Sequence, residues 1–453
     1  MRRVVCLARC LAALVVAGLV SGCERDFSAV PAASDLVFSA DTLSFDTVYA
    51  GIVPPTRRFT LRNVGKGDVT IGRIRLLGGD ASSFGVNIGG RPAVEAEGVR
   101  LAHGDSLYVF VNVRRPVAGE GVALRRVADK VVAEGGGNVW SVALEAVVLN
   151  VCRKGGVVGR DEEWLCDSIP YLVGDTLTVA RGARLTVGPG VSVLMRGGAV
   201  VDVLGALSVA GEPSRRPGFR PLRSDGFYSD IPGQWGGMRV RPGGEVSLAH
   251  ADVVSPVEGV RVDSAAAFVA DGLCLRSVSH AGIAARWADV SIANSLLLDC
   301  GGAVVSAEGG RLSMLHVTVS NHFSWDVRRS PSLSFALADS TADAFEVVSS
   351  IVVGSLADEV GTLPARGVRI RNSLIRVPRS KVEAAGGVFA DCVAASDAGF
   401  ANRAAGDYRL SARSGGVALA DMEAAERAPL DFEGVSRVGA DSIQAGAFQT
   451  VVK

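Results

Sequence analysis

A short word that begins with one polar residue and continues with apolar residues recurs through the second half of the chain. This repeat constrains the fold more than any other feature of the sequence. The words begin at His250, Asp271, Asn294, His316, Ser349 and Asn372. A unit of about 22 residues with several short strands predicts a right-handed parallel β-helix, whose rungs stack ~4.8 Å apart. The interval from His316 to Ser349 is longer than the others, which indicates an insertion near NHFSWDVRRSPSLSFALADS.

The polar residue that opens each word occupies one position of the repeat, so these side chains should form a column along the coil. We expect them to hydrogen-bond to one another as a ladder at a turn. A stripe of catalytic or ligand-binding groups is the functional alternative. The apolar residues that follow would fill the interior, together with Cys274 and Cys300 as small buried side chains.

The segments before and after the repeat have different patterns. Residues 35–150 alternate in short strands such as RRFTLRNVG and DSLYVFVNV, which predicts an antiparallel β-sandwich. Residues 151–395 would form the coil, with very short strands separated by glycine turns from Asp175 onward. Residues 396–453 break the period, and we expect a cap there because an open coil end exposes strand edges. The whole chain is therefore predicted to be all-β.

The first residues have the layout of a secretory signal. Arg2 and Arg3 precede an apolar run, residues 11–20, and Cys23 follows small residues. We expect residues 1–22 to be a lipoprotein signal peptide, Cys23 to be acylated, and residues 23–34 to form a linker. An ordinary signal peptide with a chance cysteine and a short signal anchor are the alternatives. The apolar run is shorter than the ~20 residues of a membrane span, so the acyl chains would anchor the protein.

Charge and cysteine spacing argue against several classes of function. Lys+Arg and Asp+Glu both number 47, so the net charge is zero and no basic stripe indicates a nucleic-acid partner. No CxxC or His/Cys cluster has the spacing of a zinc site, so we expect no metal and no cofactor. Cys152 and Cys166 flank a short polar loop, and the sequence leaves open whether they pair.

Three residues are candidates for ligand binding. Trp235 lies in DIPGQWGGMRVRPGG, where an indole face suits a sugar and where the glycines equally suit a structural corner at which the chain re-enters the coil. His322 and Trp325 lie in the insertion, and such loops often carry function. The alternative for these two residues is a loop packed back onto the coil.

No catalytic residue is assigned from the sequence. A galacturonase-like hydrolase needs two or three converging aspartates, in words such as NTD, DD and GHG, and none of these words occurs. A lyase needs an acidic calcium cluster with a basic residue beside it, and the aspartates of the repeat fall at different positions. We expect a non-enzymatic protein, with a polysaccharide lyase or glycoside hydrolase that has an unrecognised site as the alternative.

Several parts of the chain resemble bacterial cell-envelope proteins. Residues 35–150 resemble immunoglobulin-like modules of bacterial surface proteins, and the last residues resemble the tail that follows many bacterial β-helices. With the lipobox at Cys23, the words GPG and PGQWGG and the repeat itself, the chain resembles an uncharacterised family of right-handed parallel β-helix lipoproteins from Bacteroidota. The residues that carry the first two resemblances are Leu43, Phe45, Gly51, Phe59, Leu61, Asn63 and Gly65, then Asp407, Leu410, Ser414, Asp431, Gly434, Arg437, Ile443, Gly446 and Ala447.

This resemblance implies an outer-membrane lipoprotein that faces the cell surface or the periplasm. Glu24 and Asp26 follow Cys23 as in the surface-export signals of that phylum, although Arg25 interrupts the acidic run. We therefore expect a lipid-anchored binding, adhesion or structural protein whose coil presents a long repetitive face to a polysaccharide or protein ligand.

Substitution of the lipobox cysteine tests the predicted anchor. Cys23→Ala should release the protein from the membrane fraction into the soluble fraction, because the acyl chains would be its membrane anchor. Fractionation followed by immunoblotting measures the distribution, and an unchanged membrane-bound fraction would refute lipidation.

Overall fold

The computed structural model describes residues 35–114, 123–223, 226–336, 344–364 and 366–450. The predicted signal peptide, the acylated Cys23 and the linker lie outside these residues. The chain divides into two compact units, Met1–Asn150 and Val151–Lys453. Both consist mainly of strands, which confirms the prediction of an all-β chain. No helix within the described ranges is long and apolar enough to cross a membrane.

The first unit contains two five-stranded sheets that enclose one apolar core. The sheets have the orders β1-β3-β8-β5-β6 and β2-β10-β9-β4-β7. Their neighbours pair antiparallel except β2 with β10, which are parallel. The elements are β1 (Leu36–Phe38), β2 (Thr42–Tyr49), β3 (Arg57–Asn63), β4 (Val69–Leu76), η1 (Gly79–Ala81), β5 (Phe84–Ile88), β6 (Arg91–Pro92), β7 (Glu95–Leu101), β8 (Ser106–Val113), β9 (Leu124–Gly135) and β10 (Asn138–Leu149).

Residues in the word FTLRNVG occupy the places that their chemistry predicts. Phe59 and Leu61 are buried in the core of this unit. The side chain of Asn63 accepts a hydrogen bond from the backbone N–H of Gly65 at 3.0 Å and donates to the carbonyl of Gly67 at 2.8 Å. The asparagine therefore closes the turn after β3.

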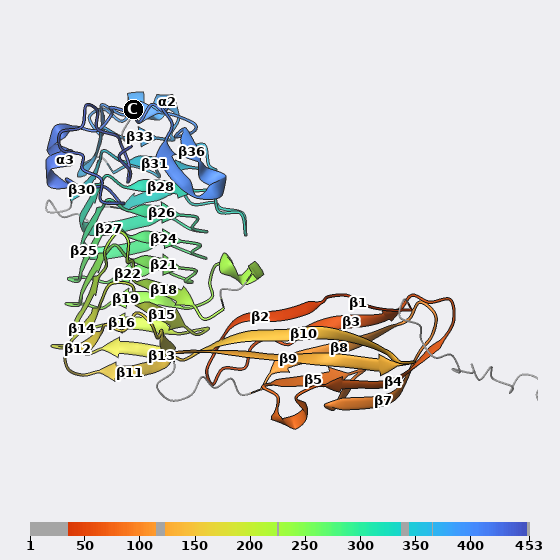
Figure 1. Cartoon of the computed structure of the whole chain (residues 1–453). Helices are drawn as coiled ribbons and strands as arrows, with labels where there is room; N and C mark the ends of the chain where they lie inside the picture. The colour runs from red at the N-terminus through yellow and green to blue at the C-terminus, as the bar shows by residue number, and fades with distance from the viewer. Residues whose placement is uncertain (1–34, 115–122, 224–225, 337–343, 365, 451–453) are drawn as a thin grey trace, which may run out of the picture. The chain divides into compact units, whose positions relative to one another are not determined.

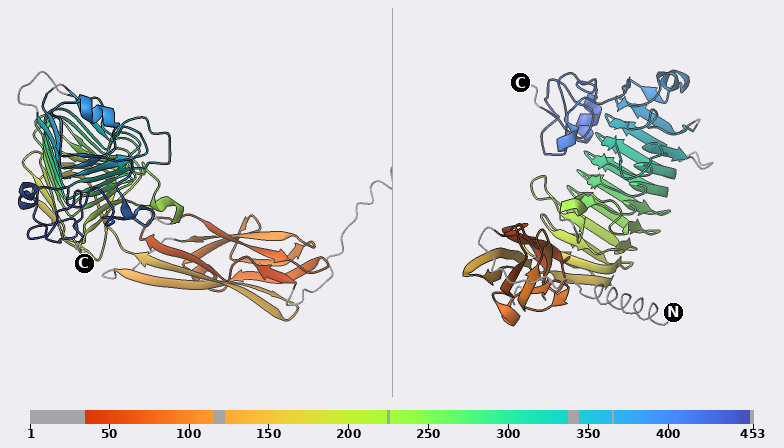
Figure 2. Two further views of the ribbon diagram at one scale, coloured as in Figure 1. Left: turned by 90° about the horizontal axis from the view of Figure 1, so that it is seen from above. Right: turned by 90° about the vertical axis from the view of Figure 1, so that its right-hand side faces the viewer.

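The main part of the second unit is a coil in which each strand from β11 to β35 pairs in parallel with a strand of a neighbouring rung. Val246 in β20 pairs with Phe268 in β23, and Phe268 pairs with Val290 in β25, so equivalent positions of successive repeats lie side by side. Figure 1 shows the rungs stacked from β11 to β33, and Figure 2 shows the stack from two further directions. This single sheet of 25 strands fits a parallel β-helix.

Most strands of the coil are three to five residues long, whereas β25 and β27 each run through a corner. Its strands are β11 (Cys152–Val158), β12 (Glu162–Trp164), β13 (Tyr171–Val179), β14 (Arg184–Val187), β15 (Ser192–Met195), β16 (Val200–Val203), β17 (Ala206–Ala210), β18 (Gly218–Pro221), β19 (Gly237–Val240), β20 (Glu245–Ala249), β21 (Asp252–Val254), β22 (Val260–Val262), β23 (Ala267–Asp271), β24 (Cys274–Arg276), β25 (Ile283–Ala293), β26 (Leu296–Leu298), β27 (Val305–Leu315), β28 (Thr318–Asn321), β29 (Leu333–Ala336), β30 (Ala344–Val348), β31 (Ile351–Gly354), β32 (Val368–Arg371), β33 (Leu374–Ile375), β34 (Phe389–Ala390) and β35 (Val393–Ala394). The short helical segment η2 (Gly226–Ser229) lies between β18 and β19.

Corners of the coil repeat as columns of residues with left-handed backbone. One column follows β20 and its successors, where φ lies between +44° and +70°. Its members are His250, Gly272, Asn294, His316, Ser349 and Asn372. Histidine and asparagine tolerate this conformation better than most residues, and glycine adopts it freely. The column therefore contains Gly272, and the Asp271 chosen from the sequence is one residue too early.

The predicted ladder of side-chain hydrogen bonds forms at one step only, where the amide of Asn294 donates to the carboxylate of Asp271 at 2.8 Å. As a continuous ladder the prediction is wrong, because the side chains of His316 and Ser349 form no hydrogen bond with another residue of the column in the described part of the chain. The backbone links the corners instead, and the N–H of His250 donates to the carbonyl of Asp271 at 2.8 Å. The polar residues recur because the corner requires a positive φ.

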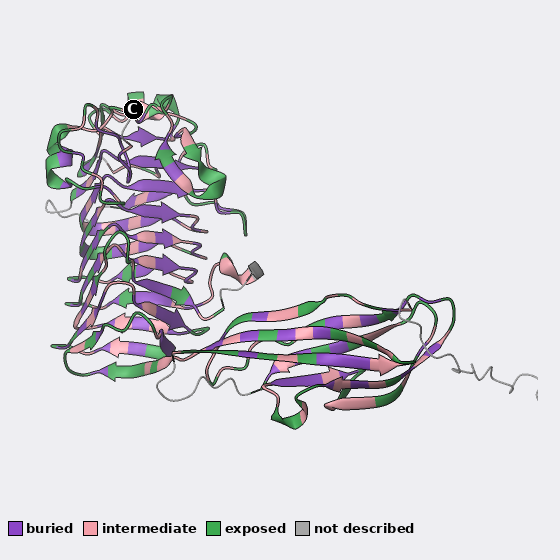
Figure 3. Cartoon of the chain, viewed as in Figure 1, coloured by how far each residue is buried: buried purple, intermediate pink, exposed green. Residues whose placement is uncertain are grey.

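Buried aliphatic and aromatic side chains form one continuous cluster inside the coil. Figure 3 shows buried residues, in purple, along the stacked strands. Phe219, Phe268 and Phe345 are fully buried there. Cys300 is also in the interior, as predicted. Cys274 is not, because it faces outward and packs against residues Leu296 and Leu298 beneath the C-terminal segment.

The C-terminal segment packs against the side of the coil. Its elements are β36 (Phe400–Asn402), η3 (Arg403–Ala405), β37 (Asp407–Leu410) and α3 (Met422–Arg427). Tyr408 and Phe448 cover the outward side chains of β26, and Ala424 lies against Leu315 and Val348. We expected residues 396–453 to cover the open end, but that end is packed by the segment of α2 (Arg379–Ala384), through residues such as Val382.

Arg437 holds the segment in place. Its guanidinium is buried and donates hydrogen bonds to the side-chain oxygen of Asn294 at 2.6 Å and to the backbone carbonyls of Ala428 and Ala447 at 3.1 and 3.2 Å. Asn294 belongs to the corner column, so this contact links the segment directly to the repeat. Burial lowers the pKa of Arg437 to about 10, which still leaves it charged at neutral pH.

The buried His316 predicts that acid destabilises the second unit. Burial, and then the charge of Arg437, lower its pKa from 6.5 to about 3. The folded state therefore stays neutral at a pH where the unfolded chain already binds a proton, so stability is full above pH ~6.5 and falls below it by ~1.4 kcal/mol per pH unit.

His316→Asn should remove this dependence, because asparagine tolerates the corner and does not titrate. We expect the stability lost between pH 7 and pH 5, measured by urea unfolding, to be about 2 kcal/mol smaller in the variant. His280→Asn, at an exposed histidine, is the control and should behave as the wild type. Equal losses in His316→Asn and wild type would contradict the assignment.

Candidate functional site

A cavity of about 500 Å³ lies outside the short strands β24 and β26, where the C-terminal segment meets the coil. Cys274, Leu296 and Leu298 line it from the coil. The insertion after β28 contributes His322 and Trp325, and the C-terminal segment contributes Arg403, Ala404, Gly406 and Tyr408. The cavity lies within the size range of ligand sites, ~300–1,000 Å³. Two of the three ligand-binding candidates from the sequence therefore come together in one place.

Asp299 lies at the corner that follows β26, with φ +47°. The same corner carries Ser277 one rung earlier. One carboxylate oxygen of Asp299 accepts the backbone N–H of His322 at 3.0 Å. Burial raises the pKa of Asp299, and this hydrogen bond opposes the rise. The carboxyl group is therefore easier to protonate than an exposed aspartate.

Two further polar groups of the cavity, His322 and Tyr408, are neutral at pH 7. Burial lowers the pKa of His322, and the positive charge of Arg403 lowers it further. Burial raises the pKa of Tyr408 to about 12. Trp325 differs from its neighbours, because 49% of its surface is exposed. An exposed indole beside neutral hydrogen-bonding groups is a suitable surface for a ligand with an apolar face and hydroxyl groups.

A buried ion pair fixes the insertion that carries His322 and Trp325. The guanidinium of Arg328 contacts both carboxylate oxygens of Glu359, one of them at 2.8 Å, and the two side chains are 1% and 0% exposed. Glu359 also accepts hydrogen bonds from the hydroxyl of Ser332 at 2.7 Å and from the N–H of Leu356 at 2.8 Å. Bidentate pairs with further donors fix geometry as well as charge.

The two arginines of the cavity differ in their partners. Arg276 donates to the carboxylate of Asp230 at 2.8 Å, so this pair is neutral overall. Arg403, in η3, is exposed and forms no ion pair with any residue that the structure describes. Arg403 is therefore the arginine of the cavity that has no ion-pair partner among the described residues.

Trp235 does not belong to the site. It is completely buried in the coil, and its indole N–H donates to the carbonyl of Val254 at 2.7 Å. Gly237 beside it has φ +104°, and a Cβ there would lie 1.7 Å from the carbonyl oxygen of Glu258. The stretch PGQWGG is a structural corner, so we set Trp235 aside as a ligand-binding residue.

Sequence reasoning missed Asp230, Asp299, Arg403 and Tyr408. Asp299 precedes Cys300 at a corner of the repeat, which is a signal only once the left-handed columns are known. Arg403 and Tyr408 enter the site because the C-terminal segment folds back, and no local pattern predicts that contact. Within the described part of the chain, no three His, Cys, Asp or Glu residues lie close enough to hold a metal ion, and Cys152 and Cys166 are both free thiols.

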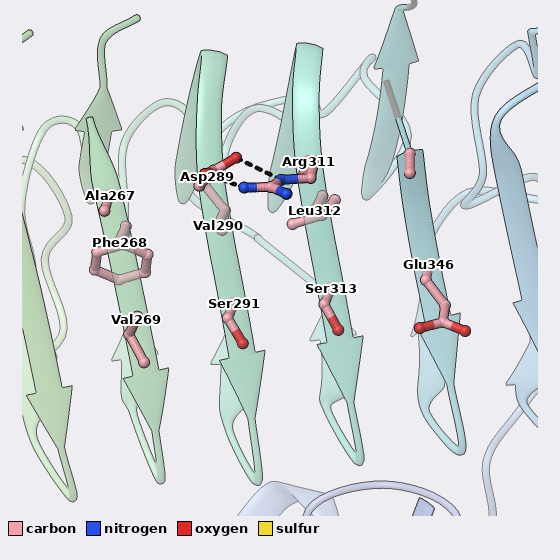
Figure 4. A pocket seen from close by; sticks show the side chains of 11 residues that line it. Ala267, Phe268, Val269, Asp289, Val290, Ser291, Arg311, Leu312, Ser313 and Glu346 are labelled. Carbon is pink, nitrogen blue, oxygen red and sulfur yellow. Dashed lines mark hydrogen bonds and ion pairs between the residues drawn. The ribbon is translucent and has the colours of Figure 1, made fainter. Parts of the chain in front are cut away.

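A second, shallower hollow of about 370 Å³ lies on the outer face of β23, β25, β27 and β30 (Figure 4). The row of Ser291, Ser313 and Glu346 crosses it, and the strands are in register there. Asp289 and Arg311 pair at 2.6 and 2.9 Å, so their charges are already matched. Ser291 and Ser313 are small side chains on this face, and the cavity at β26 combines more kinds of polar and aromatic side chains.

Comparisons with known proteins give no family for this chain. No family model matches it, and no curated protein matches it. One solved structure with partial similarity is the VesB protease from Vibrio cholerae, which is 16% identical and matches 26% of this chain and 32% of its own, with a TM-score of 0.19. Another is a family 123 glycoside hydrolase from Clostridium perfringens, which is 8% identical and matches 27% of this chain and 26% of its own, with a TM-score of 0.19. A PapD-like domain of human CEP192 matches over 29% of this chain and 94% of its own, at 12% identity and a TM-score of 0.18. The chain spans about a third or less of the first two proteins, and these similarities carry no argument about function.

Breaking the buried ion pair should disorganise the insertion. Arg328→Ala leaves the charge of Glu359 buried without its partner, which costs ~3–5 kcal/mol in comparable proteins. Arg379→Ala is the matched control, because its pair with Glu383 is exposed and such pairs contribute ~0–1 kcal/mol. Urea unfolding measures both changes. Similar values for the two variants would show that the buried pair does not fix the insertion.

Proposed function

We propose that this protein is a lipid-anchored cell-envelope protein that binds carbohydrate, without cleaving it, in the cavity at β26. The observation that carries the proposal is the meeting of Trp325, His322, Asp299 and Tyr408 at one cavity. Sugars present apolar C–H faces that stack on aromatic rings and hydroxyl groups that bond to neutral and carboxyl side chains.

The level outer face of β23, β25, β27 and β30 supports the same proposal. Its side chains repeat in rows along the coil, with Ser291 beside Ser313 in register. A long repetitive ligand such as a polysaccharide, or a protein strand, matches such a surface by many weak contacts. Fold alone is a weak argument for function, so the cavity carries the proposal and the face is secondary.

We further propose the architecture that the sequence resemblance implies. The second unit is a right-handed parallel β-helix, the first is an immunoglobulin-like sandwich, and residues 23–34 tether both to acyl chains on Cys23. The protein would be an outer-membrane lipoprotein on the cell surface or the periplasmic side, like the uncharacterised Bacteroidota family that the sequence resembles. The support is the lipobox and the repeat in the sequence.

A polysaccharide lyase or glycoside hydrolase is the second candidate, and one observation favours it. Asp299 has a raised pKa inside a cavity that also holds His322 and Tyr408, and general acids have such raised values. Glycoside hydrolysis also requires a second carboxylate, and Asp230 lines the same cavity but pairs with Arg276. This pairing is why binding without cleavage is the preferred proposal.

A glycan panel with one tryptophan variant tests carbohydrate binding. Trp325→Ala should weaken binding of the recognised glycan by about tenfold or more, because a stacked aromatic group contributes ~0.5–1.5 kcal/mol beyond the area that it buries. Trp287→Ala is the matched control: Trp287 is 45% exposed, similar to Trp325, but lies at another corner against Gly309. Equal affinities of the two variants would refute the cavity as the site.

The same panel separates binding from catalysis. Products are analysed by mass spectrometry after long incubation with purified protein. The binding proposal expects intact glycans. Cleavage that Asp299→Asn abolishes would overturn it and establish the enzyme.

A further inference from the structure

We infer that the sugar bound in the cavity at β26 is acidic, and that Arg403 binds its anionic group. This inference rests on the proposed function and names its substrate class. The charged groups around the cavity differ in whether they have an ion-pair partner. Arg276 and Asp230 neutralise each other at 2.8 Å, which leaves Arg403 and Asp299 as the other charged groups of the lining.

Arg403 lacks an ion pair although it lies among ionisable groups. No acidic side chain of the described residues lies within ion-pair distance of it. Its charge nevertheless reaches the cavity groups: burial is the main influence on the pKa values of Asp299, His322 and Tyr408, and the charge of Arg403 acts on all three as well. The guanidinium is therefore positioned at the cavity and is free to bind a ligand anion.

Asp299 and Trp325 complete the match to a sugar acid. Asp299 has one carboxylate oxygen engaged by the N–H of His322, so the carboxyl group retains capacity for a sugar hydroxyl. Trp325 offers a half-exposed ring for the C–H face. A guanidinium binds a carboxylate or a sulfate through two parallel hydrogen bonds. A sugar ring that carries an anionic group would match all three side chains: its anion would bind Arg403, a hydroxyl group would bind Asp299, and its C–H face would stack on Trp325.

An acidic peptide is the competing class of anion. It would use Arg403, but it has no ring of hydroxyl groups for Asp299 and needs no indole face. The combination of Arg403 with Trp325 at one cavity therefore favours the sugar. Carboxylate and sulfate share the chemistry that Arg403 recognises, so the experiment tests both.

The test is titration calorimetry of the detergent-solubilised full chain with three probes: oligogalacturonate, its methyl ester, and a sulfated carrageenan oligosaccharide. We expect an acidic probe to bind at least about tenfold more tightly than the neutral ester, as for loss of one charged hydrogen-bonding partner. Arg403→Gln should abolish that preference, because it should weaken binding of the acidic probe far more than binding of the ester. Arg413→Gln is the control, since Arg413 is exposed in the same segment but does not line the cavity.

The outcomes separate this inference from the proposed function. Preference for oligogalacturonate assigns a carboxylate, and preference for the carrageenan probe assigns a sulfate; either supports the inference if it depends on Arg403. Binding of the ester as tight as that of the acidic probes, with no effect of Arg403→Gln and a loss in Trp325→Ala, would overturn the inference and leave carbohydrate binding standing. No binding of any glycan, here or in the wider panel, would overturn both.

Discussion

The second unit depends on one constraint, which is that each rung must return the chain to the same backbone position at the end of every repeat. Parallel pairing keeps equivalent residues of successive rungs side by side, as Val246, Phe268 and Val290 show. The corners satisfy it with residues in left-handed backbone, such as Asn294 and His316, whose N–H groups bond to the next rung. Side chains at the corners are free to vary within the small set that tolerates a positive φ. A residue that lines the cavity can therefore occupy a corner, as Asp299 does.

An insertion is compatible with this constraint only if it leaves and rejoins the coil in register. Val305 pairs with Leu333 across the loop between β28 and β29, so the rung that contains the loop is longer than its neighbours and still ends in register. The Arg328–Glu359 pair holds that loop from within. A solvated loop of the same length would place His322 and Trp325 in many positions, whereas the buried pair gives them one. The cost of burying the two charges is offset by their mutual attraction and by the further hydrogen bonds that Glu359 accepts.

The fold was more predictable from the sequence than the site was. The repeat is a local pattern that recurs, so the all-β class and the coil follow from it. The repeat unit assigned to Asp271 starts one residue too early, because Gly272 is the corner residue. His322 and Trp325 were found because they share one short insertion. Trp235 was misleading, since glycines around a tryptophan suit a buried corner and a sugar surface equally. Arg403 and Tyr408 were missed because only the tertiary fold brings them to β26.

The return of the C-terminal segment to the side of the coil builds the cavity from two parts of the chain that are distant in sequence. Its floor is complete once the rungs form, but one wall exists only when Arg437 has docked against Asn294. A ligand that touches both parts stabilises their contact, and the contact raises affinity for the ligand by the same factor. Binding of a ligand in this cavity and docking of the C-terminal segment on the coil would therefore be coupled.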